Sequence, residues 1–280
     1  ALEKQMNVLI HEVLTNTKST QRQQASLQLR QMLDSVLRIP GSFHYHFSKL
    51  EGVSIVQPSD ASCRIFTWQL YLDNNDYKYR GFIQKANGKV YPLKDNSDDM
   101  RTVEFSVLKP QNWYGALYYN LHTFQHDGQT LYLLFGYDVF GFYNHRKLLD
   151  VLYFDEKGQP KFGKDVLEMK DGFGRKRTVK RFLLEYSASV NVSLNYDKTL
   201  EMVVYDHLIY GQPIRSAGPS NVPDGSYCGL KLNKYGVWEY IDKVHKDDPS
   251  KILVDATTYE KMIGTETKRK AQKDIFGRSK

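Results

Sequence analysis

The feature that most restricts the fold is the strict alternation of apolar and polar side chains in residues 181–210. The apolar members stand at even positions, namely Phe182, Leu184, Tyr186, Ala188, Val190, Val192, Leu194 and Tyr196, whereas odd positions from 185 to 195 carry Glu, Ser and Asn. Successive side chains point to opposite faces of a β-strand, so this pattern predicts one buried face and one wet face. Turn-like residues at 195–198 predict that the chain then folds back, and we interpret the segment as a β-hairpin.

Further strands separated by short turns are predicted from residue 41 to residue 246. They include 42–47, 53–56, 63–72, 77–84, 90–93, 130–137, 147–154 and 162–169, with 227–232 paired to 237–242. Parallel strands need crossovers of a dozen or more residues, so the short turns favour antiparallel pairing. The prediction is a mainly β body, an antiparallel meander forming a sandwich, a barrel or irregular propeller-like sheets. Periodicity leaves residues 113–124 open between a strand and a buried helix.

Two amphipathic helices precede the strands. The apolar stripes are Leu2, Met6, Leu9, Ile10, Val13 and Leu14 in the first helix, and Ala25, Leu29, Met32, Leu33 and Val36 in the second, whose opposite face is rich in Gln and Arg. Residues 15–19 join the helices and Pro40-Gly41 ends the second one, so residues 1–40 are predicted to form a helical hairpin. The hairpin either packs on the chain's own sheet or offers a docking surface to a partner, because both stripes keep a heptad-like spacing.

Basic residues are concentrated in two short segments. The chain has 39 Lys and Arg against 32 Asp and Glu, and segments 170–181 and 268–280 each hold six basic residues and one acidic residue. The rest of the chain therefore has a slight negative charge, which argues against a general nucleic-acid-binding surface. The candidates for binding a partner or an anionic ligand are Lys170, Arg175, Lys176, Arg177 and Lys180. Residues 247–280 are predicted to be a C-terminal extension that ends in a basic tail.

Two carboxylates stand where the strand pattern calls for apolar residues. Asp206 follows Leu200, Met202 and Val204 in the even phase, and Asp150 lies within the apolar run 147–154. Each is a weak catalytic candidate, and together they would resemble the carboxylate pair of a glycosidase if they converged on one cleft. For Asp206 the alternative is a structural carboxylate that accepts backbone N–H bonds from the loop 216–226. For Asp150 the alternative is a buried ion pair with Arg146 or Lys147.

His207 cannot act as the acid/base partner of Asp206, since neighbouring strand residues point to opposite faces. Asp224 and Gly225 are assigned a structural role in the predicted turn 223–226.

No residue pattern indicates a cofactor or a metal centre. The pairs His122/His126 and His44/His46 have spacings that suit metal ligands, but no third ligand stands at a recognised distance. Cys63 and Cys228 are either two buried thiols or one long-range disulfide. Nucleophile-elbow, P-loop and zinc-protease motifs are absent, so the interpretation leans away from an enzyme. No apolar run approaches the length of a membrane-spanning helix.

Four segments resemble an uncharacterised family of exported envelope proteins of Bacteroidetes-type bacteria. The segments are 136–154, 181–208, 218–230 and 273–280, and the resemblance extends over residues 40–280. It implies export, removal of a leader, and a periplasmic or outer-membrane-associated location, and the chain's start at Ala1 is consistent with a removed leader or a trimmed terminus. The family carries no assigned reaction, so no catalytic residue is implied. This chain has Cys228 where the family pattern has an aspartate, which argues against an essential carboxylate there.

These observations favour an exported envelope binding or accessory protein, a component of a larger assembly with a protein partner. The alternative is a hydrolase of envelope glycans that uses Asp206 and Asp150. A third interpretation, recognition of an anionic ligand by the basic segment, predicts binding that weakens steeply with salt.

Overall fold

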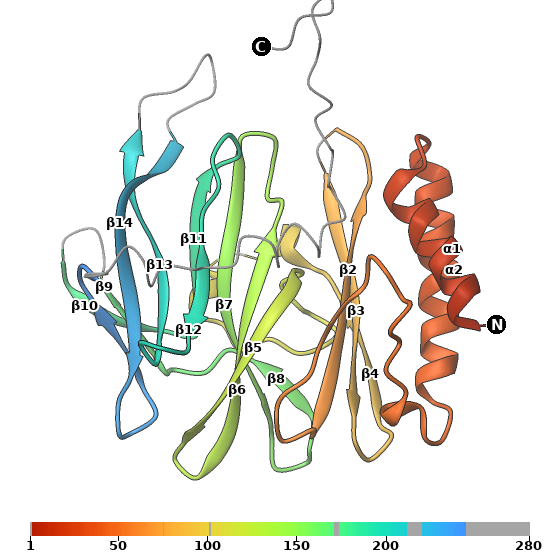
Figure 1. Cartoon of the computed structure of the whole chain (residues 1–280), viewed down its shortest axis with the longest axis horizontal. Helices are drawn as coiled ribbons and strands as arrows, with labels where there is room; N and C mark the ends of the chain where they lie inside the picture. Colours follow the sequence, from red (N-terminus) through yellow and green to blue (C-terminus); the bar gives the residue numbers. More distant parts are fainter. Residues whose placement is uncertain (1, 75, 101, 171–173, 212–219, 245–280) are drawn as a thin grey trace, which may run out of the picture. The chain divides into compact units, whose positions relative to one another are not determined.

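Two helices and three β-sheets form the first of two compact units, which ends at His245. The computed structural model describes residues 2–74, 76–100, 102–170, 174–211 and 220–244 (Figure 1). The predicted C-terminal extension, 247–280, lies outside the described residues. The predicted N-terminal hairpin is α1 (Leu2–Thr15) and α2 (Ser19–Leu37), and it belongs to the same unit as the sheets.

The first sheet is covered by the helices on one face. It has the order β1 (Ser54–Val56), β2 (Cys63–Tyr71), β3 (Tyr77–Lys85) and β4 (Val90–Lys94). Apolar side chains from α1 and α2 share a core with this sheet, and its members include Met6, Ile10, Leu29, Phe66, Trp68 and Phe82. Figure 1 shows the two helices side by side along this sheet. The helical stripes therefore pack on the chain's own sheet.

The central strands of the second sheet are buried on both faces. It has the order β11 (Arg181–Ser187), β7 (Asn144–Phe154), β6 (Gln129–Asp138) and β5 (Leu117–His126), with β8 (Pro160–Phe162) beside β7. Along β6, Tyr132 and Leu134 pack toward the first sheet, while Leu131, Leu133 and Phe135 pack toward the third. Burial on both faces explains why this part of the sequence reads as apolar runs rather than as alternation.

The third sheet closes the other side of the second sheet. Its order is β10 (Lys176–Val179), β9 (Leu167–Lys170), β15 (Trp238–Ile241), β14 (Ser220–Leu232), β13 (Met202–Gly211) and β12 (Leu194–Asp197). All neighbours pair antiparallel except β15 and β9, which pair parallel. The mainly β, antiparallel prediction with an N-terminal helical hairpin is confirmed. Open sheets stacked over shared cores correspond to the sandwich among the predicted arrangements.

The predicted hairpin 181–210 is wrong in its first strand. β11 pairs with β7 in the second sheet, whereas β12 pairs with β13 in the third sheet. The even-numbered residues from Phe182 to Tyr196, except Ala188, nevertheless pack against one core, because the chain passes between two sheets that face each other across it. The alternation identified the buried face correctly and could not reveal the change of sheet.

The predicted strand 42–47 is also wrong. Residues Ser42–His44 form a short 3-10 turn (η1) and the following residues are irregular. Backbone N–H groups of His44 and Tyr45 bond to carbonyls three residues earlier, and the carbonyls of Ser42 and Tyr45 accept bonds from the Arg64 guanidinium. These local bonds replace a strand ladder. The ambiguous residues 113–124 include most of β5.

Candidate functional site

An apolar groove runs between the two helices on their exposed side and has a volume of about 700 Å³. It is lined by Leu2, Gln5, Val8, Leu9, Gln28, Gln31, Met32, Ser35, Val36 and Ile39. Val8 is 58% exposed and Ile39 is 50% exposed, although each belongs to a large apolar residue type. None of the lining side chains is ionisable. The groove therefore offers apolar surface and uncharged hydrogen-bonding groups.

The lining residues follow the spacing of a helix–helix contact. Leu2, Gln5 and Leu9 of α1 are three and four residues apart, and Gln28, Met32, Ser35 and Ile39 repeat four, three and four residues apart. This 3-4 spacing is the one that lets side chains of one helix fit between those of another. The hairpin thus carries a buried stripe toward the sheet and a second stripe toward the groove.

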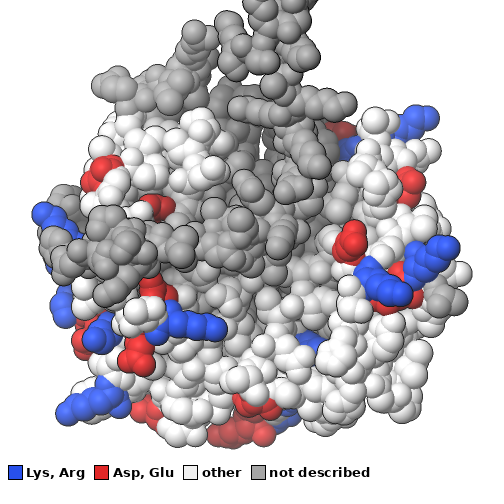
Figure 2. Space-filling view, in the orientation of Figure 1, with Lys and Arg blue, Asp and Glu red and all other residues white. Residues whose placement is uncertain are grey.

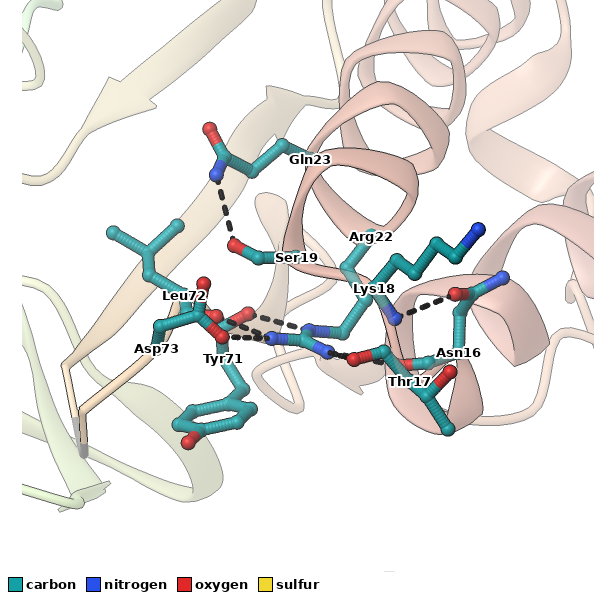
Figure 3. A network of polar contacts seen from close by, with 9 residues as sticks. All are labelled: Asn16, Thr17, Lys18, Ser19, Arg22, Gln23, Tyr71, Leu72 and Asp73. Carbon is teal, nitrogen blue, oxygen red and sulfur yellow. Dashed lines mark hydrogen bonds and ion pairs between the residues drawn. The ribbon is translucent and has the colours of Figure 1, made fainter.

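Arg22 fixes the turn of the hairpin to the first sheet (Figure 3). Its side chain is 4% exposed, and its acceptors are the carbonyl oxygens of Asn16, Thr17, Tyr71 and Leu72 and the carboxylate of Asp73. Asn16 and Thr17 directly follow α1, Tyr71 is the last residue of β2, and Leu72 follows it. One guanidinium thereby joins both helices to the β2–β3 turn, and the sequence had suggested only a wet Gln- and Arg-rich face.

The other end of the hairpin is fixed by a second buried network. The carbonyl oxygen of Leu37, the last residue of α2, accepts bonds from Ser42 Oγ and Gln84 Nε2 at 2.9 and 2.8 Å. The Arg64 guanidinium donates in turn to Gln84 Oε1, and burial lowers the pKa of Arg64 to about 10. Both ends of α2, which forms one side of the groove, are thus anchored.

A buried carboxylate at the end of β6 has a raised pKa. Asp138 is 7% exposed and accepts a 2.8 Å bond from Tyr114 Oη. Burial raises its pKa to about 6, the nearby Asp95 carboxylate adds to this rise, and the Tyr114 bond and the Arg146 charge oppose it. Arg146 also donates to Tyr114 and binds Glu185 through two nitrogens. The Asp138 carboxylate is thus bonded to Tyr114, which is itself held by Arg146.

A buried amine lies on the other face of the second sheet. Lys147 is 4% exposed, and its Nζ lies 4.5 Å from the ring centre of Tyr119 and 5.2 Å from that of Tyr137. Burial lowers the pKa of Lys147 to about 7. His145 lies on the same face, two residues before Lys147 on β7, and its Nδ1 is 3.1 Å from Tyr137 Oη. The electron-rich ring faces stabilise the ammonium form in part.

The two candidate catalytic carboxylates do not converge. Asp150 is 0% exposed on the side of the second sheet that faces the first sheet, and it forms a 2.8 Å ion pair with the equally buried Arg181. A buried ion pair had been predicted, but its cation is Arg181 of the neighbouring strand rather than Arg146 or Lys147. Asp206 belongs to the third sheet. The paired-carboxylate hydrolase interpretation therefore lacks its cleft.

Asp206 does not point into the core as the sequence had suggested. Leu194 pairs with Tyr205 and Tyr196 pairs with Val203, so the odd positions of β13 share the buried face. Asp206 lies on the opposite face, half-buried, and accepts a bond from the backbone N–H of Ser193. This donor precedes β12 and is not part of the predicted loop 216–226, of which residues 216–219 lie outside the described residues.

Asp224 and Gly225 belong to an irregularity inside one long strand. β14 runs through the predicted turn, and its register with β13 shifts between Asp206 and Leu208. Gly225 has a φ of +86°, a value that glycine adopts without strain. The Ser226 hydroxyl and backbone N–H donate to the Asp224 carboxylate, and Nδ1 of His207 lies 2.8 Å from the same carboxylate. These bonds lower the pKa of Asp224 to about 2.

Most of the candidate basic residues already have acidic neighbours. Ion pairs join Lys170 to Asp242, Lys176 to Glu168, Arg177 to Glu104 and Lys180 to Asp165, and Arg175 has a further interaction of its own. On the face drawn in Figure 2, acidic and basic side chains also lie close to one another rather than in separate fields. An anionic ligand would compete with these carboxylates, so the predicted binding at this segment has no geometric support.

The histidine pairs do not form metal sites within the described residues, which hold no cluster of three ligating side chains. His122 stacks on Tyr196 with ring centres 3.8 Å apart, and His126 bonds to the Tyr235 carbonyl. Both lie on strand β5, not on the helical face that their spacing had suggested. Cys63 and Cys228 are free, buried thiols in different cores.

Comparisons with protein-family models, curated proteins and solved structures find no match to this chain. Within the described part of the chain, neither helix is long and apolar enough to cross a membrane. Sequence periodicity predicted the two helices that form the groove. The predicted apolar stripes also included four of its lining residues, Leu2, Leu9, Met32 and Val36, but not that these side chains stay partly exposed.

Proposed function

We propose that this chain is an exported binding or accessory component of a bacterial envelope assembly, and that it docks an apolar helical surface of a protein partner in the α1–α2 groove. The observation that carries the proposal is the exposed, uncharged, apolar lining of this groove. It lies on helices whose other stripes are already buried against the first sheet. The proposal rests on a surface that the described residues leave partly exposed.

The energetics favour an apolar occupant. Leu2, Val8 and Ile39 are each about half exposed, with values of 47%, 58% and 50%. Removing a large apolar side chain from water contributes about 1.5–3 kcal/mol when burial is complete. An exposed cluster of this kind, bordered by polar side chains, is typical of an interaction surface.

The anchored ends of the hairpin support the same proposal. Arg22 and the Gln84 network hold α2 at both ends, so little conformational freedom remains to be lost when a partner binds. A preformed groove spends less of its interaction energy on ordering than a flexible one.

Charge substitutions in the groove test the proposal. A glutamate at position 8 or 39, introduced as Val8→Glu or Ile39→Glu, would bring an unpaired charge into an apolar contact and should abolish the contact. Leu27→Glu is the matched control, because Leu27 is an equally large apolar residue of α2, is 46% exposed and does not line the groove. The full chain and its variants are recovered with their neighbours after crosslinking in cell envelopes.

We expect the wild-type chain and the Leu27→Glu variant to recover the same partner and both groove variants to lose it. Recovery of that partner by Val8→Glu and Ile39→Glu at the wild-type level would contradict the proposal. The envelope location is supported by the sequence resemblance alone, and fractionation of cells that produce the protein tests it separately.

A further inference from the structure

We infer that the occupant of the α1–α2 groove is the same groove of a second copy of this chain. Two hairpins would then pack face to face about a two-fold axis as a four-helix bundle, with the sheets on the outside. This inference rests on the proposed function, because it presumes that the groove docks helices, and it goes further by naming the partner.

The first argument is charge. A two-fold interface brings each patch against an identical patch, so any unpaired charge near the axis meets its own like charge. All ten lining side chains are uncharged, and the groove therefore contains nothing that repels a copy of itself. A partner that carries a charged helix face would find no complementary charge in the lining.

Two charged groups beside the groove have partners within one chain. The Glu3 carboxylate accepts bonds from Tyr45 Oη and from the backbone N–H of Lys49, at 2.6 and 2.7 Å. Arg38 forms an ion pair with Asp34, one turn away, through two nitrogens. The Arg38–Asp34 pair therefore adds no net charge at the α2 edge of the groove.

The second argument is hydrogen bonding. Gln5, Gln28 and Gln31 carry both donors and acceptors on one amide, so a glutamine in one copy can pair with a glutamine in the other. A surface with donors alone or acceptors alone cannot satisfy itself in this way. The polar side chains of the lining can therefore pair with their own copies across a two-fold axis.

The third argument is helix geometry. Both helices present residues at the 3-4 spacing of a coiled-coil seam, on α1 through Leu2, Gln5 and Leu9 and on α2 through Gln28, Met32 and Ser35. Two antiparallel hairpins that meet along such seams give the packing of a four-helix bundle, with helices about 20° from antiparallel. The 19 residues of α2 extend over about 28 Å, which is long enough for several layers of contact.

The molar mass of the purified full-length chain in solution tests this inference. Sedimentation equilibrium over a wide concentration range should give twice the monomer mass of 32.6 kDa at the upper end. Val8→Glu and Ile39→Glu should each raise the dimer dissociation constant about tenfold or more, because each change appears twice at a two-fold interface. Leu27→Glu should leave the constant unchanged, and circular dichroism should show the same fold for all chains.

A wild-type chain that is monomeric over the whole range overturns the inference, whatever the variants do. Dissociation of the Leu27→Glu variant to the same extent as the groove variants also overturns it, because the interface would then lie elsewhere. The chain could be monomeric in sedimentation and still crosslink to a different envelope protein, with that crosslink lost in Val8→Glu. This result would reject the second copy as the occupant and would leave the proposed function standing. Failure of both experiments would remove both.

Discussion

The Asp138 carboxyl shows how the fold can change the behaviour of one residue. Its sequence context, a tyrosine and a valine at the end of an apolar run, contains no signal for a perturbed acid. The raised pKa comes mainly from burial and in part from the Asp95 carboxylate, which is far away in sequence. Such a residue is found only once the fold has brought distant segments together.

Asp138 should make the protein less stable as the pH rises from about 4 to about 6. Its folded pKa of about 6 exceeds the ordinary value of 3.8, so the folded state holds an extra proton in this window. The stabilising contribution is complete below the window and is lost above it, and its size is on the order of 3 kcal/mol. Asp138→Asn keeps an acceptor for Tyr114 and does not titrate.

Urea unfolding of both chains at several pH values measures this effect. Relative to the wild type, Asp138→Asn should gain stability between pH 4 and pH 6 and then keep the gain, since all other groups titrate alike in both chains. Parallel stability profiles for the two proteins would mean that Asp138 does not titrate in this range.

The Asp150–Arg181 pair should be costly to break and cheap to replace. Arg181→Met alone leaves a buried carboxylate without its cation and should destabilise the fold by about 3–5 kcal/mol. The double variant Asp150→Leu/Arg181→Met removes both charges and should recover most of that loss. Denaturant unfolding of the single and double variants checks this, and equal losses in both would argue for a role beyond charge neutralisation.

At the scale of elements, the hairpin depends on a single arginine. Arg22 donates to carbonyls that follow α1 and that end β2, so Arg22→Ala should cost on the order of 2 kcal/mol and loosen both helices. Hydrogen exchange should speed up in α1 and the first turn of α2. Arg38→Ala, which breaks an exposed ion pair on α2, is the control and should have little effect.

Unchanged exchange in α1 after Arg22→Ala would mean that apolar packing alone holds the hairpin. The groove variants should then be interpreted without the assumption of a rigid groove.

Element-scale patterns could be read from the sequence, whereas their partners could not. The alternation of residues 182–196 predicted the buried face correctly, yet β11 and β12 belong to different sheets. The turn of the β12–β13 hairpin has four residues, 198–201, so Asp197 pairs with Met202 and the buried face shifts from even positions in β12 to odd positions in β13. This shift moved Asp206 from the core to the other face and removed the strongest catalytic candidate.

At the scale of the whole unit, stacking explains what composition could only suggest. The second sheet lies between two others, so its central strands are apolar on both faces. The buried charges of Asp150 and Arg181 in this sheet form an ion pair. The mainly β class, the antiparallel pairing and the helical hairpin were predictable from turns and periodicity. The order of strands within sheets, and the groove as an open surface, depend on contacts between distant residues.

The central claim is that the groove between α1 and α2 is the surface by which this chain binds a partner. Site-specific photocrosslinking tests it most directly, with a benzophenone side chain in place of Gln31 in the groove or of Gln21, an exposed residue of α2 outside the groove. The full chain is irradiated in the cells that produce it, and the mass of each adduct is measured. We predict a strong, discrete adduct from position 31 and none from position 21, with a mass of two copies of this chain. Equal or absent crosslinking at the two positions would contradict the claim.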